Sequence, residues 1–326
     1  MIVRAQIYPQ EMKEKSPKVL ITDDVHPLLI EGLQQRGYDV EFRPDISYKE
    51  TQAVIKEYNG LIINSKILCD DQFFERASKL KWVARLGSGM EIIDMDAAEA
   101  RGISVFNTPE GNRNAVAEHA IGLLLCLYRN LLQTNQEMSN GVWLREANRG
   151  EEIAGKTIGI IGFGNTGSRF ASLLSAFGVK ILIFDPYKQR IDIPERFEYV
   201  MKMQAIQQEA DVISLHVPLN NETNHMVDAA FIAGCERKPV LINSSRGAVV
   251  DTNALLDGLK NGFLSGACLD VFENEKPETF SASEKENFKQ LCDLKQVVTS
   301  PHIAGWTHQS KQKLAEWVLK KLDALN

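Results

Sequence analysis

The segment TIGIIGFGNTG, residues 157–167, decides the fold class of this chain. Its first five residues have the apolar character of a short buried strand, and a helix over residues 165–176 is expected after the glycine-rich turn. The next apolar strand, ILIFD, ends in Asp185, 23 positions after Gly162. This order is the fingerprint of a dinucleotide-binding βαβ unit: a strand, a G-x-G-x-x-G turn, a helix, and a second strand that is followed by an acidic residue.

Each position of the turn has a physical role in this interpretation. Gly162 makes the tight turn, Gly164 lets the backbone approach a pyrophosphate, and Gly167 lets the helix pack closely on the strand. Asn165 and Thr166 begin the helix, where backbone N–H groups without intrahelical partners bind anions. We therefore expect these five residues to bind the pyrophosphate.

Asp185 predicts which dinucleotide binds. Its carboxylate is placed to accept hydrogen bonds from the ribose hydroxyls and would repel a 2′-phosphate, which favours NAD over NADP. Lys188 and Arg190 lie close by in the sequence and weaken this preference. The alternative interpretation is a purely structural glycine turn beside a solvated Asp185.

Outward from this segment, short apolar strands alternate with amphipathic helices, which predicts parallel α/β architecture. Before it, strands are expected at residues 18–22, 38–42, 60–64, 81–85 and 103–107, and helices at residues 27–36 and 72–80. After it, strands are expected at residues 240–243, 266–271 and 297–299. The length of 326 residues is typical of about two domains.

Three other segments have distinctive patterns. Residues 116–138 predict one long helix, apolar on most sides in its first turns, as helices buried between layers or domains are. Residues 275–296 are polar and irregular, and predict a loop with one helical turn. The last segment predicts an amphipathic helix with one apolar face, made of Leu314, Trp317, Val318, Leu322 and Leu325.

Composition argues against several classes of protein. The net charge of -6 disfavours binding to nucleic acid or to an anionic membrane. The five cysteines are scattered, without CxxC pairs or metal-ligand spacing, so we expect neither a metal site nor a disulfide framework. No apolar stretch approaches the length of a membrane span or forms a signal-peptide core, and we expect a soluble, cytoplasmic protein.

Three ionisable residues follow predicted strands. Arg246 comes after VLIN in NSSRGAVVD, Glu275 comes after the strand at residues 266–271, and His302 comes after VVTSP. Ligands of open α/β sheets bind beyond the carboxyl ends of the strands. We therefore expect the three side chains to share one site with the dinucleotide.

Hydride transfer to or from a hydroxy acid requires such a set. A neutral His302 can take the hydroxyl proton as hydride leaves the carbon. Glu275 would hold the imidazole tautomer, and the planar fork of Arg246 would bind the substrate carboxylate. Taken singly, each residue has an ordinary alternative: a structural histidine, a solvated loop glutamate and a surface ion-pair arginine.

Taken together, the motifs resemble the D-2-hydroxy-acid dehydrogenase family, which includes phosphoglycerate, glycerate and formate dehydrogenases. GFGNTG with Asp185, HVPLNNET from His216, INSSRGAVVD, CLDVFENE and SPHIAGWT occur in the family's order, and the similarity covers nearly the whole chain. The resemblance implies that His302 is the acid/base, Glu275 its partner and Arg246 the carboxylate anchor.

The resemblance also implies further contacts with NAD and substrate. Four residues would line the cofactor: His216, Thr223, Ser244 and Asp270. Five residues would contact the substrate: Ser65, Lys66, Ser88, Gly89 and Asn112. The sequence departs from the family's pattern at Asn64, where many relatives carry a basic residue, and between Glu275 and His302, where the chain is longer than usual.

For the fold, the resemblance implies two doubly wound parallel-sheet domains with a cleft between them. A flavodoxin-like substrate domain would comprise residues 1–114 and 303–326, and a Rossmann NAD domain would comprise residues 115–302. No C-terminal regulatory domain is expected. Because the helix at residues 116–138 offers more apolar surface than one domain covers, a homodimer or homotetramer is expected.

The expected function is that of an NAD-dependent enzyme similar to phosphoglycerate dehydrogenase, with Lys66 and Arg145 available for a substrate phosphate. The nearest alternative is a glycerate or hydroxypyruvate reductase of the same family. An alternative of another class is an NAD-sensing binding protein, because some family members act as transcriptional co-repressors. A short-chain dehydrogenase is set aside because no tyrosine is followed four residues later by lysine.

Overall fold

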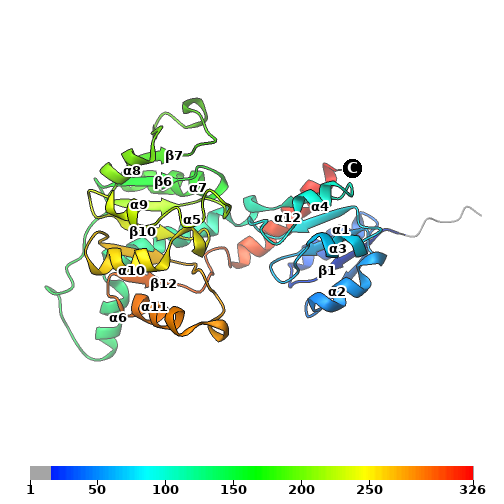
Figure 1. Ribbon diagram of the computed structural model, residues 1–326, viewed down its shortest axis with the longest axis horizontal. Helices are drawn as coiled ribbons and strands as arrows, with labels where there is room; N and C mark the ends of the chain where they lie inside the picture. Colours follow the sequence, from blue (N-terminus) through cyan, green and yellow to red (C-terminus); the bar gives the residue numbers. More distant parts are fainter. Residues whose placement is uncertain (1–15, 326) are drawn as a thin grey trace, which may run out of the picture. The chain divides into compact units, whose positions relative to one another are not determined.

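The strands before and after residue 115 form two separate parallel sheets in the computed structural model, which describes residues 16–325 (Figure 1). The chain divides into two compact units: unit 1 takes the described residues up to Leu86, Ile92–Asn107 and the residues from Val318 onward, and unit 2 takes Gly87–Glu91 and Thr108–Trp317. Residues 87–91, 108–114 and 303–317, expected in the substrate domain, therefore fall in unit 2. The reason is packing, because Gly111 on the first long helix lies against the backbone of Leu314.

Unit 1 has a five-stranded parallel sheet in the order β2-β1-β3-β4-β5. The order reverses between β1 and β3, as in flavodoxin-like folds, and the central strands are almost wholly buried. The strands are β1 (Lys18–Ile21), β2 (Asp39–Phe42), β3 (Gly60–Ile63), β4 (Trp82–Arg85) and β5 (Ser104–Asn107). The helices are α1 (Pro27–Gln35), α2 (Tyr48–Val54), α3 (Asp71–Arg76) and α4 (Met95–Glu99).

Unit 2 has a seven-stranded parallel sheet in the order β12-β11-β10-β9-β6-β7-β8. This is the doubly wound order of dinucleotide-binding folds, and its direction reverses between β6 and β9. The strands are β6 (Thr157–Ile161), β7 (Lys180–Phe184), β8 (Glu198–Tyr199), β9 (Val212–Leu215), β10 (Val240–Asn243), β11 (Gly266–Leu269) and β12 (Val297–Thr299). Helices α7 (Asn165–Leu174), α8 (Met203–Glu209), α9 (Ala229–Ala233) and α10 (Thr252–Lys260) connect them. The predicted fold class is confirmed.

Alternate residues of these strands face two hydrophobic cores. On β10, Leu241 belongs to the core that contains Leu256 of α10, while Ile242 belongs to the core that contains Phe170 of α7. A parallel sheet covered on both faces needs near-continuous apolar strands, which is what the sequence provides. Each such side chain, once fully buried, contributes about 1.5–3 kcal/mol to folding.

The prediction of one helix at residues 116–138 was wrong about where the helix starts and about its being continuous. Helix α5 (Pro109–Tyr128) begins earlier, with proline at its first turn, and a second helix, α6 (Leu131–Ser139), follows at an angle of 62°. The break lies at Asn130, whose backbone is left-handed with φ of 52°. Asparagine tolerates this conformation better than most residues, so a helix can end there.

Two further expectations about the C-terminal third need correction. The segment expected to hold one helical turn contains the three-turn helix α11 (Ala282–Asp293), which begins with a capping box between Ser281 and Glu284. The final helix, α12 (His308–Asp323), buries Val318 and Leu322 as expected, but Leu325 lies beyond its end and is half exposed.

Within residues 16–325, no single helix is both long enough and apolar enough to cross a membrane. The bent pair α5 and α6 passes that test only when the two helices are counted together. Five buried residues of α5 belong to a hydrophobic core of unit 2: Ala117, Ala120, Ile121, Leu123 and Leu124.

Candidate active site

The glycine turn between β6 and α7 has the geometry that its sequence predicts. Gly162 has φ of +92°, and a side chain there would also collide with the carbonyl oxygen of His216, 2.4 Å from an added Cβ. A Cβ on Gly167 would lie 2.0 Å from the carbonyl oxygen of Gly162, so α7 can approach β6 only with glycine. Beside Gly164, the N-cap of α7, there is open space. The turn thus leaves room for an anion at the helix N-terminus.

Asp185 lies directly after β7 and is 8% exposed. Its Oδ2 accepts a hydrogen bond from the backbone N–H of Phe163 at 2.7 Å, and its Oδ1 accepts one from Tyr187 at 2.9 Å. The first bond ties the carboxylate to the glycine turn itself. Each oxygen keeps a second lone pair, so the carboxylate can also accept ribose hydroxyls.

The residues at this edge of the sheet fit a bound dinucleotide. The hydroxyl of Ser244, just beyond β10, is one of the buried polar atoms of residues 16–325 that have no hydrogen-bond partner. A buried hydroxyl without a partner is costly unless a ligand satisfies it. Together with the open space at Gly164 and the position of Asp185, it fits NAD lying along the carboxyl ends of the strands.

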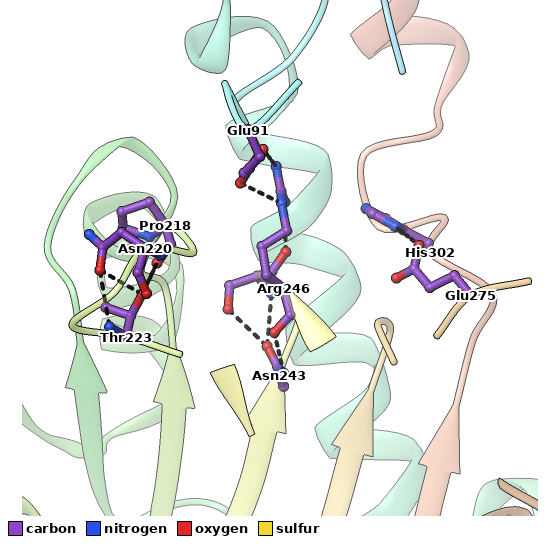
Figure 2. Close-up of polar contacts among 9 residues, drawn as sticks. Glu91, Pro218, Asn220, Thr223, Asn243, Arg246, Glu275 and His302 are labelled. Carbon is purple, nitrogen blue, oxygen red and sulfur yellow. Dashed lines mark hydrogen bonds and ion pairs between the residues drawn. The ribbon is translucent and has the colours of Figure 1, made fainter. Parts of the chain in front are cut away.

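Two other residues expected to line the cofactor are engaged in local contacts. His216 follows β9; its Nε2 is 2.9 Å from Ser214 Oγ and its ring packs on Phe170 at 5.0 Å. Burial lowers the pKa of His216 to about 3, so the ring is neutral at physiological pH. The Thr223 hydroxyl donates to the carbonyl oxygen of Pro218 at 2.6 Å and closes its own loop (Figure 2).

The His302 and Glu275 side chains, 27 residues apart in sequence, point toward one another (Figure 2). His302 Nδ1 lies 2.7 Å from Glu275 Oε2. A carboxylate can only accept, so this contact places the proton on Nδ1 of the neutral ring and leaves Nε2 as the acceptor. Both side chains remain substantially exposed, 47% for His302 and 40% for Glu275, and are therefore accessible to a substrate.

The backbone of His302 is left-handed, with φ of 54°, and neighbouring groups hold it in this unfavourable conformation. Its N–H donates to the carbonyl oxygen of Asp270 at 2.7 Å. The Asp270 carboxylate accepts the N–H groups of Ile303 and Ala304, both at 2.9 Å, and the Ser300 hydroxyl at 2.6 Å. Asp270 thus holds the loop by hydrogen bonds on both sides of His302.

Burial of Asp270 acts to raise its pKa, but its hydrogen bonds outweigh this effect and hold the pKa below the usual value. One donor in this network, His119 on α5, was not among the predicted site residues. Its Nε2 lies 2.8 Å from Ser300 Oγ and 3.4 Å from Asp270 Oδ1. A histidine in an otherwise apolar stretch of helix was the sequence signal that could have found it.

Arg246 lies on the loop after β10 and is held at its backbone by Asn243, which is 1% exposed. Asn243 Nδ2 donates to the Arg246 carbonyl oxygen at 2.9 Å, and its Oδ1 accepts the N–H and hydroxyl of Ser245. The guanidinium is paired with Glu91 through a 2.9 Å contact from Nε to Oε1 (Figure 2). Glu91 was not predicted as a site residue, and its position just after the GSGM turn is the only sequence signal for it.

The expected substrate contacts fall in both units. In unit 2, Ser88 Oγ lies 3.4 Å from Asn112 Oδ1, and Gly89 lies directly against the guanidinium of Arg246. Ser65 and Lys66 belong to unit 1, where the Lys66 ammonium donates to the carbonyl oxygen of Pro44. Arg145 lies on an exposed segment of unit 2.

Known proteins are similar to this chain in sequence. Residues 121–304 match the family model described as "D-isomer specific 2-hydroxyacid dehydrogenase, NAD binding domain". The chain is 35% identical over 273 residues to a hydroxypyruvate reductase of Thermotoga maritima, covering 84% of this chain and 86% of that protein. It is 33% identical over 307 residues to a D-3-phosphoglycerate dehydrogenase of Methanocaldococcus jannaschii, covering 94% of this chain but only 56% of that protein.

Solved structures share the fold. The D-lactate dehydrogenase of Aquifex aeolicus, solved with NAD and lactic acid, matches with a TM-score of 0.82 and 27% identity, covering 94% of this chain and 95% of that one. The chain therefore has the length of some relatives and about half the length of others.

Proposed function

This chain belongs to the D-isomer specific 2-hydroxyacid dehydrogenases, a family of NAD-dependent oxidoreductases, and we propose that it interconverts a small 2-hydroxy acid and its 2-oxo acid, with hydroxypyruvate as the first candidate. The 2.7 Å contact between His302 Nδ1 and Glu275 carries the proposal. It is the arrangement that a proton-exchanging imidazole needs beside a substrate oxygen.

In this proposal, His302 Nε2 takes the proton of the substrate hydroxyl during oxidation and returns it during reduction. Glu275 keeps the proton on Nδ1 and stabilises the imidazolium that forms. Arg246 binds the substrate carboxylate through N–H groups of its guanidinium. Bound NAD supplies the hydride acceptor, and its reduced form the donor. Gly164 and the first turn of α7 would hold its pyrophosphate, and Asp185 its ribose.

Asp185→Ala should weaken NAD binding by roughly 10–150-fold, because a charge-assisted hydrogen bond of ~1.5–3 kcal/mol is lost. NADP binding should weaken less, because the carboxylate no longer repels the 2′-phosphate. Titration of NADH and NADPH by fluorescence measures both constants. Glu222→Ala, which removes an exposed carboxylate that pairs with the Tyr187 hydroxyl, is the control. Unchanged constants for both cofactors in the Asp185 variant would remove it from the ribose site.

Two observations favour a substrate without a phosphate. The Lys66 ammonium, which the sequence offered for a phosphate contact, donates a hydrogen bond to the carbonyl oxygen of Pro44 within unit 1. In addition, the chain is 35% identical to the hydroxypyruvate reductase and 33% identical to the phosphoglycerate dehydrogenase. A phosphoglycerate dehydrogenase activity is the second candidate, supported by the 33% identity to that enzyme.

A panel assay tests the proposal directly. NADH oxidation should be followed with hydroxypyruvate, glyoxylate, pyruvate and phosphohydroxypyruvate at equal concentration. We expect hydroxypyruvate or glyoxylate to be reduced at least as well as phosphohydroxypyruvate. Two phosphate contacts would instead give phosphohydroxypyruvate an advantage of ~10²–10⁴ in kcat/KM, which Lys66→Met should erase. That result would favour the second candidate, and no activity on any of the four would contradict both.

We also propose that the chain forms a homodimer through α6 and the segment that follows it. Six large apolar side chains there are 39–73% exposed, and Trp143 is the most exposed of them. The others are Leu131, Leu132, Met138, Val142 and Leu144. Several large exposed apolar side chains within one short segment point to an interface. Sedimentation at micromolar concentration should give a dimer or a larger species, and Trp143→Glu should shift it toward monomer; a monomeric parent would refute the proposal.

A further inference from the structure

Glu91 occupies one edge of the Arg246 guanidinium. Its Oε1 accepts from Nε at 2.9 Å and its Oε2 accepts from Nη2 at 3.4 Å, so the carboxylate faces the edge that these two nitrogens share. Arg246 Nη1 donates to the carbonyl oxygen of Ser245 at 2.7 Å. A guanidinium has five N–H groups. Within residues 16–325, three of them are engaged, which leaves one on each terminal nitrogen for a carboxylate.

The backbone around this ion pair is tightly placed. A Cβ on Gly89 would lie 1.7 Å from Arg246 Nη2 and 2.2 Å from Glu91 Oε2, so the loop backbone touches both partners. Gly87 anchors the same loop through hydrogen bonds in both directions with Thr108, at 3.2 Å from its N–H and 2.9 Å to its carbonyl oxygen. The ion pair is also shielded, with the side chains of Arg246 and Glu91 only 25% and 33% exposed. An anchored, partly buried carboxylate can fix the plane of the guanidinium.

We propose that Glu91 is a positioning residue for substrate binding: it holds Arg246 so that its two remaining terminal N–H groups meet the substrate carboxylate. This inference rests on the proposed function, in which Arg246 is the carboxylate anchor. Without Glu91, the guanidinium can rotate about its side-chain bonds and must be ordered again when substrate binds. Removal of Glu91 should therefore weaken binding of the substrate carboxylate and leave the proton exchange at His302 unchanged.

The test compares glyoxylate with its methyl ester, which has the same carbonyl but no carboxylate charge. Glu91→Ala should lower kcat/KM for glyoxylate by at least ~10-fold, mainly through KM, and should leave the ester nearly unchanged. NADH affinity should stay the same. Glu91→Gln keeps one acceptor oxygen and the side-chain volume. Its kcat/KM for glyoxylate should therefore lie between those of the parent and of Glu91→Ala. Glu209→Ala, which breaks the ion pair with Lys180 at an exposed site, is the matched control.

Each other outcome would overturn the proposal. An equal loss of kcat/KM for glyoxylate and for the ester would mean that Glu91 only supports the structure. If Glu91→Ala fails to fold, the same comparison can be made with Glu91→Gln. An unchanged KM would mean that Glu91 has no role in substrate binding. A gain in kcat/KM would mean that Glu91 competes with substrate for Arg246. Because parent activity on glyoxylate is measured first, failure of the proposed function is recognised separately.

Discussion

His302→Asn is expected to lower kcat by at least ~10²-fold with little change in NAD affinity. Proton transfer by a positioned side chain contributes about 10²–10⁴-fold, and asparagine cannot exchange the proton. Asparagine is preferred to alanine here because the backbone of His302 has φ of 54°, a conformation that asparagine tolerates. Steady-state kinetics with the best 2-oxo acid of the panel, together with NADH titration, measures the effect.

The chain offers a closely matched control in His225. It also has a left-handed backbone, with φ of 51°, and its Nε2 lies 3.0 Å from a glutamate, Glu273. His225→Asn therefore removes a similar contact between histidine and glutamate from a similar backbone, outside the proposed site. Its kcat should stay within about threefold of the parent, because no proton transfer in the reaction depends on it. A His302 variant as active as this control would show that another group moves the proton.

Arg246→Gln is expected to lower kcat/KM by ~10²–10⁴-fold. Two hydrogen bonds to a carboxylate, each contributing ~1.5–3 kcal/mol, would be lost together. The variant also leaves Glu91 as an unpaired carboxylate beside the substrate, which adds repulsion. Kinetics on the same 2-oxo acid gives the ratio, and NADH titration should show an unchanged cofactor affinity.

Two further variants sharpen this result. Arg246→Lys keeps the charge but not the planar fork, so it should recover only part of the activity. Arg237→Gln breaks an exposed pair with Asp211 elsewhere in unit 2 and should leave kcat/KM unchanged. Full activity of the Arg246→Lys enzyme would mean that charge alone, without the fork, anchors the substrate.

Most of the secondary structure could be predicted because apolar periodicity is local. The strand at residues 157–161 and the turn that follows it appear where the pattern placed them. The single helix at residues 116–138 was wrong because its break depends on the left-handed backbone of Asn130, which leaves no trace in hydrophobic spacing. Helix α11 was missed although the Ser281 and Glu284 capping box was present in the sequence.

The sequence by itself determined the dinucleotide turn, because its three glycines and Asp185 act through contacts within one βαβ unit. It also indicated Arg246, Glu275 and His302, since parallel strands end at one edge of a sheet. Tertiary structure alone decided which hydrogen-bonding groups remain free. Arg246 and Glu91 are 155 positions apart in the sequence, but the fold pairs them. In the same way, helix α5 brings His119 to the loop of His302. Such pairings depend on strand order and helix packing, which bring together residues that no sequence periodicity relates.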